Sequence, residues 1–154
     1  MRIAIGSDHA GFELKQLLMP YIASLGHQLL DVGAYSEQPS DDYPDYAEPL
    51  GVALLQKQAD RGILVCGSGV GVSVAVNKLP GIRAAVCHDT YSAHQGVEHD
   101  DMNVLVMGSR VVAIELAKEL VRSFLAAVFS GEERHARRLA KVRAIEARYC
   151  KGGA

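Results

Sequence analysis

Cys66-Gly67-Ser68-Gly69-Val70-Gly71 follows directly on Gly62-Ile63-Leu64-Val65, an apolar run of the kind that forms a buried strand. Alternating glycines at the end of a strand let the backbone turn sharply and point successive N–H groups at one place. A helix that begins next adds its positive N-terminal end. The stretch therefore predicts a strand, an anion-binding loop and a helix in succession.

The rest of the chain repeats this alternation. Apolar runs typical of strands end at Gly6, Val32, Cys66, Cys87 and Met107. Helical patterns occupy residues 12–25, 46–58, 70–78, 90–98 and 112–129, and a final helix is predicted at 133–149, after a break at Ser130-Gly131. Such alternation predicts a parallel sheet with helices on both faces.

Composition favours one ordinary globular domain over residues 1–154, with 49% hydrophobic and 22% charged residues. A net charge of −2 gives no pull toward nucleic acid, and no apolar run is long enough for a membrane span. Because the chain opens directly on a strand-like run, we expect no signal peptide and a cytoplasmic protein. The three cysteines are widely spaced, so we expect reduced thiols without disulfides or metal.

Cys66 is the candidate reactive group. Oriented N–H dipoles favour a thiolate, so we expect this thiol to lose its proton easily and to act as a base or nucleophile. The alternative is a small buried apolar residue, as most free cysteines are. The loop lacks the patterns of a nucleophile elbow and a Walker loop. A dinucleotide site is weakened by Val72 but stays open, because Asp89 stands near the usual ribose-binding distance.

Ligands of open parallel sheets sit beyond the carboxyl ends of the strands. We expect a cleft there, lined by Ser7-Asp8-His9-Ala10-Gly11, residues 66–73, His88-Asp89, His99-Asp100-Asp101-Met102-Asn103 and Gly108-Ser109-Arg110. Taken singly, Asp8 could be a helix cap, His9 a structural imidazole and Asn103 a turn residue.

The final helix combines a basic face with a narrow apolar stripe. Arg134 and Arg138 are four residues apart, a spacing that suits a phosphate dianion, although basic helix faces are often only solvated. The stripe of Leu139, Val142 and Ile145 needs a cover, for which we expect a second copy of the chain.

Seven stretches in colinear order carry a resemblance that spans essentially the whole chain: Asp8-His9-Ala10-Gly11-Phe12, Asp42-Tyr43-Pro44, Cys66-Gly67-Ser68-Gly69-Val70-Gly71-Val72-Ser73, Asn77-Lys78, Gly81-Ile82-Arg83-Ala84, Asn103-Val104 and Gly108-Ser109-Arg110. Together they resemble the ribose-5-phosphate isomerase B family, with its galactose-6-phosphate isomerase relatives. The resemblance implies a Rossmann-like three-layer α/β/α sandwich, with a five-stranded parallel sheet and an extra C-terminal helix. It also implies a homodimer or dimer of dimers, in which some site residues enter from the neighbouring subunit.

The same resemblance implies interconversion of an aldose phosphate and a ketose phosphate without metal or cofactor. Cys66 matches the base that moves a proton between C1 and C2, and His99, with Asp8 nearby, matches the acid-base group of ring opening. Ser68 replaces a common threonine whose hydroxyl helps move a proton between O1 and O2. The phosphate-binding positions are His9, Arg110, Arg134 and Arg138, assisted by His135; Tyr43 lines the sugar site, and the oxyanion is expected to meet backbone N–H groups of Gly67, Gly69, Val70, Gly71 and Ser73.

One departure from the family concerns the sugar. Many relatives have asparagine where this chain has Asp100, and a carboxylate there removes a donor and adds negative charge. Asn103 remains as a candidate contact. The leading interpretation is ribose 5-phosphate isomerisation. The alternatives are an isomerase of a four- or six-carbon sugar phosphate and a phosphate- or nucleotide-binding module without turnover. A metal-dependent isomerase is disfavoured because His94 and His99 are five residues apart.

Overall fold

A computed structural model describes residues 1–37 and 41–150, so the last four residues of the predicted domain lie outside it. The elements follow in the order β1 (Arg2–Ser7), a 3-10 turn η1 (His9–Gly11), α1 (Phe12–Ser24), β2 (Gln28–Asp31), α2 (Pro44–Leu55), β3 (Arg61–Cys66), α3 (Val70–Val76), β4 (Ala84–Val86), α4 (Thr90–Asp100), β5 (Val104–Gly108), α5 (Ile114–Ala126) and α6 (Glu133–Tyr149). The predicted order of strands and helices is confirmed. Helix α2 begins two residues earlier than expected, because Pro44 suits a first helical turn.

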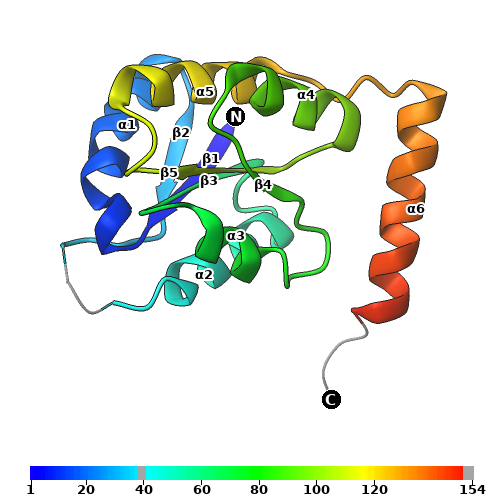
Figure 1. Cartoon of the computed structure of the whole chain (residues 1–154), viewed down its shortest axis with the longest axis horizontal. Helices are drawn as coiled ribbons and strands as arrows, with labels where there is room; N and C mark the ends of the chain where they lie inside the picture. The colour runs from blue at the N-terminus through cyan, green and yellow to red at the C-terminus, as the bar shows by residue number, and fades with distance from the viewer. Residues whose placement is uncertain (38–40, 151–154) are drawn as a thin grey trace.

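The five strands form one parallel sheet in the order β2-β1-β3-β5-β4. Helices α1, α4 and α5 cover one face of the sheet, and α2 and α3 cover the other (Figure 1). Alternate strand residues feed the two cores: Ile63 and Val65 pack with the first set of helices, and Leu64 and Cys66 with the second. The predicted three-layer α/β/α sandwich is therefore confirmed.

Strands β1 and β3 are neighbours, but the chain leaves them in opposite directions, β1 toward β2 and β3 toward the β5 side. This is the switch point at which open sheets form a crevice. Ser7 is in register with Val65, so the next step along both strands sets Asp8 beside Cys66. A Cβ on Gly11 would lie 2.3 Å from the Val65 carbonyl oxygen, so only glycine lets the turn after β1 pack this closely on β3.

The segment from His99 to Asn103 lies elsewhere than the sequence suggested. It joins the end of α4 to the start of β5, and the carboxyl ends of parallel strands share one edge of the sheet. Residues that precede β5 therefore belong to the amino edge, at the far end of the sheet from Cys66. The expectation that they lie at the carboxyl edge is wrong.

Helix α6 stands apart from the three layers, beyond the end of α4 (Figure 1). Of its predicted apolar stripe, Leu139 is buried, whereas Val142 and Ile145 are 51% and 57% exposed. Within one chain the stripe is thus mostly uncovered, as the sequence predicted.

A buried lysine fixes the segment that follows β2. Lys15 of α1 is fully buried, and its Nζ donates to Asp31 Oδ1 at 2.6 Å and to the Ala34 carbonyl at 2.7 Å. Its ammonium group also lies over the rings of Phe12 and Tyr35. These contacts anchor the start of the connection that leads on to α2 and the site.

Replacing Lys15 by Met should lower the free energy of unfolding by about 3 kcal/mol, because it leaves the Asp31 carboxylate without its cation. Lys118→Met is the matched control. The Lys118 ion pair is almost as short, 2.8 Å, but its partner Glu115 is 81% exposed, so we expect a loss below about 1 kcal/mol. Urea unfolding measures both variants; equal losses would contradict this assignment.

Candidate active site

A thiol and a carboxylate meet at the switch point. Cys66 Sγ donates to Asp8 Oδ2 at 2.8 Å, and the other carboxylate oxygen accepts from the Gly11 N–H at 3.0 Å. Both side chains are buried, with 8% of Cys66 and 4% of Asp8 exposed. Asp8 is thus a cap of the 3-10 turn and a partner of the thiol at once.

The surroundings of Cys66 raise its pKa, contrary to the expectation from the loop dipoles. Burial is the largest cause, and the hydrogen bond and negative charge of Asp8 add to it. The N–H groups of Gly69 and Gly67 act in the predicted direction and lower the pKa, but they are outweighed. The sequence predicts Asp8 and Cys66 in one cleft but not the direct contact of the carboxylate with the sulfur. At neutral pH the resting group is therefore the thiol.

Cys66 lines a pocket of about 370 Å³ whose wall includes cationic, acidic and apolar residues. Its lining residues are Asp8, His9, Ala10, Cys66, Gly67, Ser68, Arg110 and Val111. Arg110 lies over the loop, where a Cβ on Gly67 would come within 3.4 Å of its Nε. The structure thus brings together the predicted residues that follow β1, β3 and β5.

Tyr43 closes the α3 side of the glycine loop. A Cβ on Gly71 would lie 2.9 Å from the Tyr43 ring, so the phenol packs directly on the loop backbone. Ser68 is exposed, and its hydroxyl accepts from the Val70 N–H at 3.3 Å. The Ser73 N–H donates to the Gly69 carbonyl at 3.1 Å, so this predicted oxyanion donor is already engaged within the chain.

A second group of predicted residues gathers where α4 meets α6. The rings of His99 and His135 stack with centroids 4.0 Å apart. Gln95 Nε2 donates to His99 Nδ1 at 2.8 Å, and Ser130 Oγ hydrogen-bonds His135 Nδ1 at 2.7 Å. Burial, His99 and then Arg134 lower the pKa of His135, which favours its neutral form. Within one chain, this histidine cluster is separate from the Cys66 pocket.

The two predicted arginines of α6 are on its exposed surface. Arg134 pairs with Glu132 at 2.9 Å, and Arg138 forms no ion pair with any residue in the described ranges. Asp100 is exposed at the end of α4, next to His99. His99, Asp100 and the two arginines therefore form one surface, and the expected proximity of Asp8 to His99 is not found within a chain.

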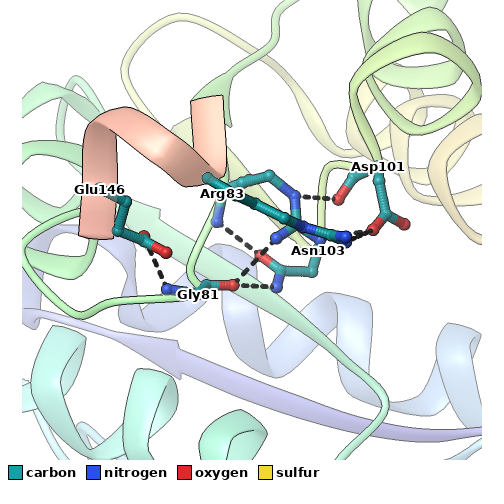
Figure 2. A network of polar contacts seen from close by, with 6 residues as sticks. Gly81, Arg83, Asp101, Asn103 and Glu146 are labelled. Atoms are coloured by element: carbon teal, nitrogen blue, oxygen red, sulfur yellow. Dashed lines mark hydrogen bonds and ion pairs between the residues drawn. The ribbon is translucent and has the colours of Figure 1, made fainter. Parts of the chain in front are cut away.

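Asn103 belongs to a network that fastens α6 to the body (Figure 2). Its amide accepts from the Arg83 N–H and donates to the Gly81 carbonyl, both at 2.8 Å. Arg83 in turn donates to the Asp101 carboxylate at 2.7 Å, and the Gly81 N–H donates to Glu146 of α6 at 2.7 Å. Both ends of the Asn103 amide are thus engaged in holding the loop before β4.

Sequence reasoning missed Asp41. Its Oδ1 pairs with Nδ1 of His9, and only 8% of its side chain is exposed. The neighbouring Asp42-Tyr43-Pro44 carried the family resemblance, and nothing in the spacing distinguishes the two adjacent aspartates. Only its placement beside His9 distinguishes Asp41 from Asp42, whose side chain is exposed.

Among residues 1–37 and 41–150, no group of three or more His, Cys, Asp or Glu side chains is arranged to hold a metal ion. In the same ranges, no helix has the length and apolar character needed to cross a membrane.

Comparison with known proteins places the chain in a family. The family model described as Ribose/Galactose Isomerase matches residues 3–142. The chain belongs to this family. Ribose-5-phosphate isomerase B of Escherichia coli K12 is 45% identical over 147 residues, 96% of this chain and 97% of that protein. D-erythrulose-4-phosphate isomerase of Pectobacterium atrosepticum is 42% identical, over 85% of this chain and 86% of that protein.

The fold agrees with this assignment to the Ribose/Galactose Isomerase family. The structure of Clostridium thermocellum ribose-5-phosphate isomerase B superposes with a TM-score of 0.93 at 44% identity, covering 97% of this chain and 99% of that chain. The resemblance inferred from the seven sequence stretches is confirmed.

Asp8→Asn should lower the pKa of Cys66, because it removes the charge that opposes the thiolate and supplies an amide donor to the sulfur. We expect iodoacetamide to alkylate Cys66 at a lower pH in the variant than in the wild type. Peptide mass spectrometry measures the extent of alkylation at each pH. Exposed Cys150 is the internal control and should alkylate alike in both proteins. An unchanged or higher midpoint for Cys66 would contradict the role assigned to Asp8.

Proposed function

We propose that this member of the Ribose/Galactose Isomerase family interconverts D-ribose 5-phosphate and D-ribulose 5-phosphate through an enediolate. The carrying observation is the 2.8 Å contact between the Cys66 thiol and the Asp8 carboxylate at the wall of a pocket that also holds His9 and Arg110. The pocket thus holds a base, which is Cys66, and an acceptor for the thiol proton, which is Asp8. It also holds two cations for a phosphate, His9 and Arg110.

The proton transfers follow from this geometry. Asp8 accepts the proton of the Cys66 thiol, and the thiolate then removes the proton from C2 of the open-chain aldose. The C2–H electron pair becomes part of the enediolate, whose charge the N–H groups of Gly67 and Gly69 stabilise. Cys66 returns the proton to C1, and the Ser68 hydroxyl relays the proton between O1 and O2. Asp8 then returns its proton to the Cys66 thiolate, which restores the resting thiol. Aldose becomes ketose with no net gain or loss of atoms or electrons.

The remaining groups come from a second copy of the chain in this proposal. His99, Arg134 and Arg138 share a surface at the α4–α6 junction, separate from the Cys66 pocket of their own chain. The uncovered stripe of α6 gives a reason for two chains to associate. We therefore infer a homodimer, or a dimer of dimers, in which His99 opens the sugar ring and the two arginines bind phosphate across the interface.

The relatives favour ribose 5-phosphate, but two observations support a second substrate. The Pectobacterium relative is named for a four-carbon ketose phosphate, and Asp100 adds a carboxylate beside His99. A four-carbon sugar phosphate is the second candidate, and a six-carbon sugar is the third. Turnover of ribose, erythrose, allose and galactose phosphates in one assay ranks them.

The compartment follows from the chemistry of the base. All three cysteines are free, and Cys66 can take part in proton transfer only while it stays reduced. We propose that the enzyme acts in the cytoplasm, where thiols are kept reduced.

Cys66→Ala should lower the turnover of ribose 5-phosphate by about 10²- to 10⁴-fold, the usual effect of removing a positioned base. Phosphate affinity should stay close to wild type, because the cations are intact. Cys87→Ala is the matched control, since Cys87 is equally buried but lies outside the pocket, and it should keep its turnover. A Cys66→Ala variant with nearly full activity would show that the base is another group.

Mixing two inactive variants tests the shared site. Cys66→Ala and Arg138→Ala subunits, allowed to exchange, should recover about a quarter of wild-type activity, because half of the dimers are mixed and each has one intact site of two. Mass spectrometry of the intact dimers verifies the exchange. Verified exchange with no recovery would place Cys66 and Arg138 in the same site of one chain.

A further inference from the structure

The pair formed by His9 and Asp41 has no place in the proton transfers above. Asp41 comes from the connection between β2 and α2, and His9 from the turn after β1. The Asp41 side chain is 8% exposed, whereas His9 is 35% exposed and forms part of the pocket wall. A nearly buried carboxylate therefore stands behind an imidazole that faces the ligand space.

The hydrogen bond to Asp41 fixes the orientation of the His9 ring and the protonation of one of its nitrogens. Nδ1 carries a proton, because it donates to Asp41 Oδ1. Nε2 is left without a hydrogen-bond partner among the described residues, on a ring that borders the pocket with Arg110. When Nε2 is protonated as well, the ring is a cation with one donor held by the protein and one directed to a ligand.

We propose that Asp41 is a positioning residue that holds His9 as an imidazolium, so that His9 and Arg110 bind the substrate's phosphate as a pair of cations at neutral pH. The proposal rests on the phosphate-binding role of His9 in the proposed function. Asp41 does not itself touch the substrate. It acts through the ring that it orients and charges.

The charged groups around His9 support a cation. The hydrogen bond to Asp41 is the largest influence and raises the pKa of His9, and the charges of Asp41 and Asp8 add to it. Burial and the positive charge of Arg110 act in the opposite direction but are outweighed. Behind Asp41 stands Tyr46 of α2, whose pKa is raised by burial and by Asp41, so it remains neutral.

The positive charge of His9, and with it the affinity for an anion, depends on pH. Because the pKa of His9 is raised, its positive charge persists above the ordinary histidine range and is lost as the pH rises through the raised value. Without Asp41 the charge should be lost at lower pH, while the pocket keeps Arg110. Anion affinity should then weaken at neutral pH but recover in acid.

The chain contains its own matched control. Asp42 is the next residue and carries the same charge, but its side chain is exposed and forms no hydrogen bond or ion pair with His9. Asp41→Asn and Asp42→Asn therefore change the net charge and the composition equally. Only the first removes the partner of His9.

The test titrates His9 by NMR in both variants and the wild type and measures binding of sulfate, whose charge is constant between pH 5.5 and 8, by calorimetry. We expect Asp41→Asn to lower the pKa of His9 and to bind sulfate about tenfold more weakly at pH 7.5, with affinity close to wild type near pH 5.5. Asp42→Asn should match the wild type throughout.

Three results would overturn the proposal. They are a His9 titration in the wild type at or below the ordinary value, an unchanged titration in Asp41→Asn, or an affinity loss that is the same at every pH. The titration of His9 in the wild type does not depend on any variant, so it can overturn the proposal even if Asp41→Asn misfolds. An absence of ribose 5-phosphate turnover in the wild type would instead contradict the proposed function, whatever the titration shows.

Discussion

Two adjacent parallel strands that the chain leaves in opposite directions determine this site. Because β1 and β3 are paired in register, the residues that follow them must meet, and Asp8 comes to lie 2.8 Å from the Cys66 sulfur. The backbone contact of Gly11 with Val65 keeps the turn after β1 close to the loop after β3. The pocket, the state of the thiol and the placement of His9 all follow from this approach.

The same geometry is the reason for proposing that two chains share the site. Residues after β3 and residues before β5 lie at opposite edges of the sheet. Helix α6 lies next to the residues at the amino edge. It is held there by the hydrogen bond from Gly81 to Glu146 and by the stacking of His135 on His99. Its apolar stripe and its arginines are exposed within one chain, and we propose that a second copy of this chain covers them.

Periodicity sufficed for the order of the elements, the three layers and the bounds of α6, because those depend on local patterns of apolar residues. It also placed Cys66 at the end of a strand. It failed for features set by tertiary contacts: the pKa of Cys66 is raised by burial and by a carboxylate 58 positions away, and Asp41 pairs with a histidine 32 positions away. The location of His99 at the amino edge follows from strand direction and was predictable from the same alternation.

A crystal structure of the Cys66→Ala variant with ribose 5-phosphate tests the central claim most directly. We expect C1 and C2 of the sugar beside position 66 and Asp8 of one chain, with His99, Arg134 and Arg138 of a second chain in contact with the same sugar phosphate. A sugar bound with C1 and C2 away from position 66, or held by residues of one chain alone, would contradict it.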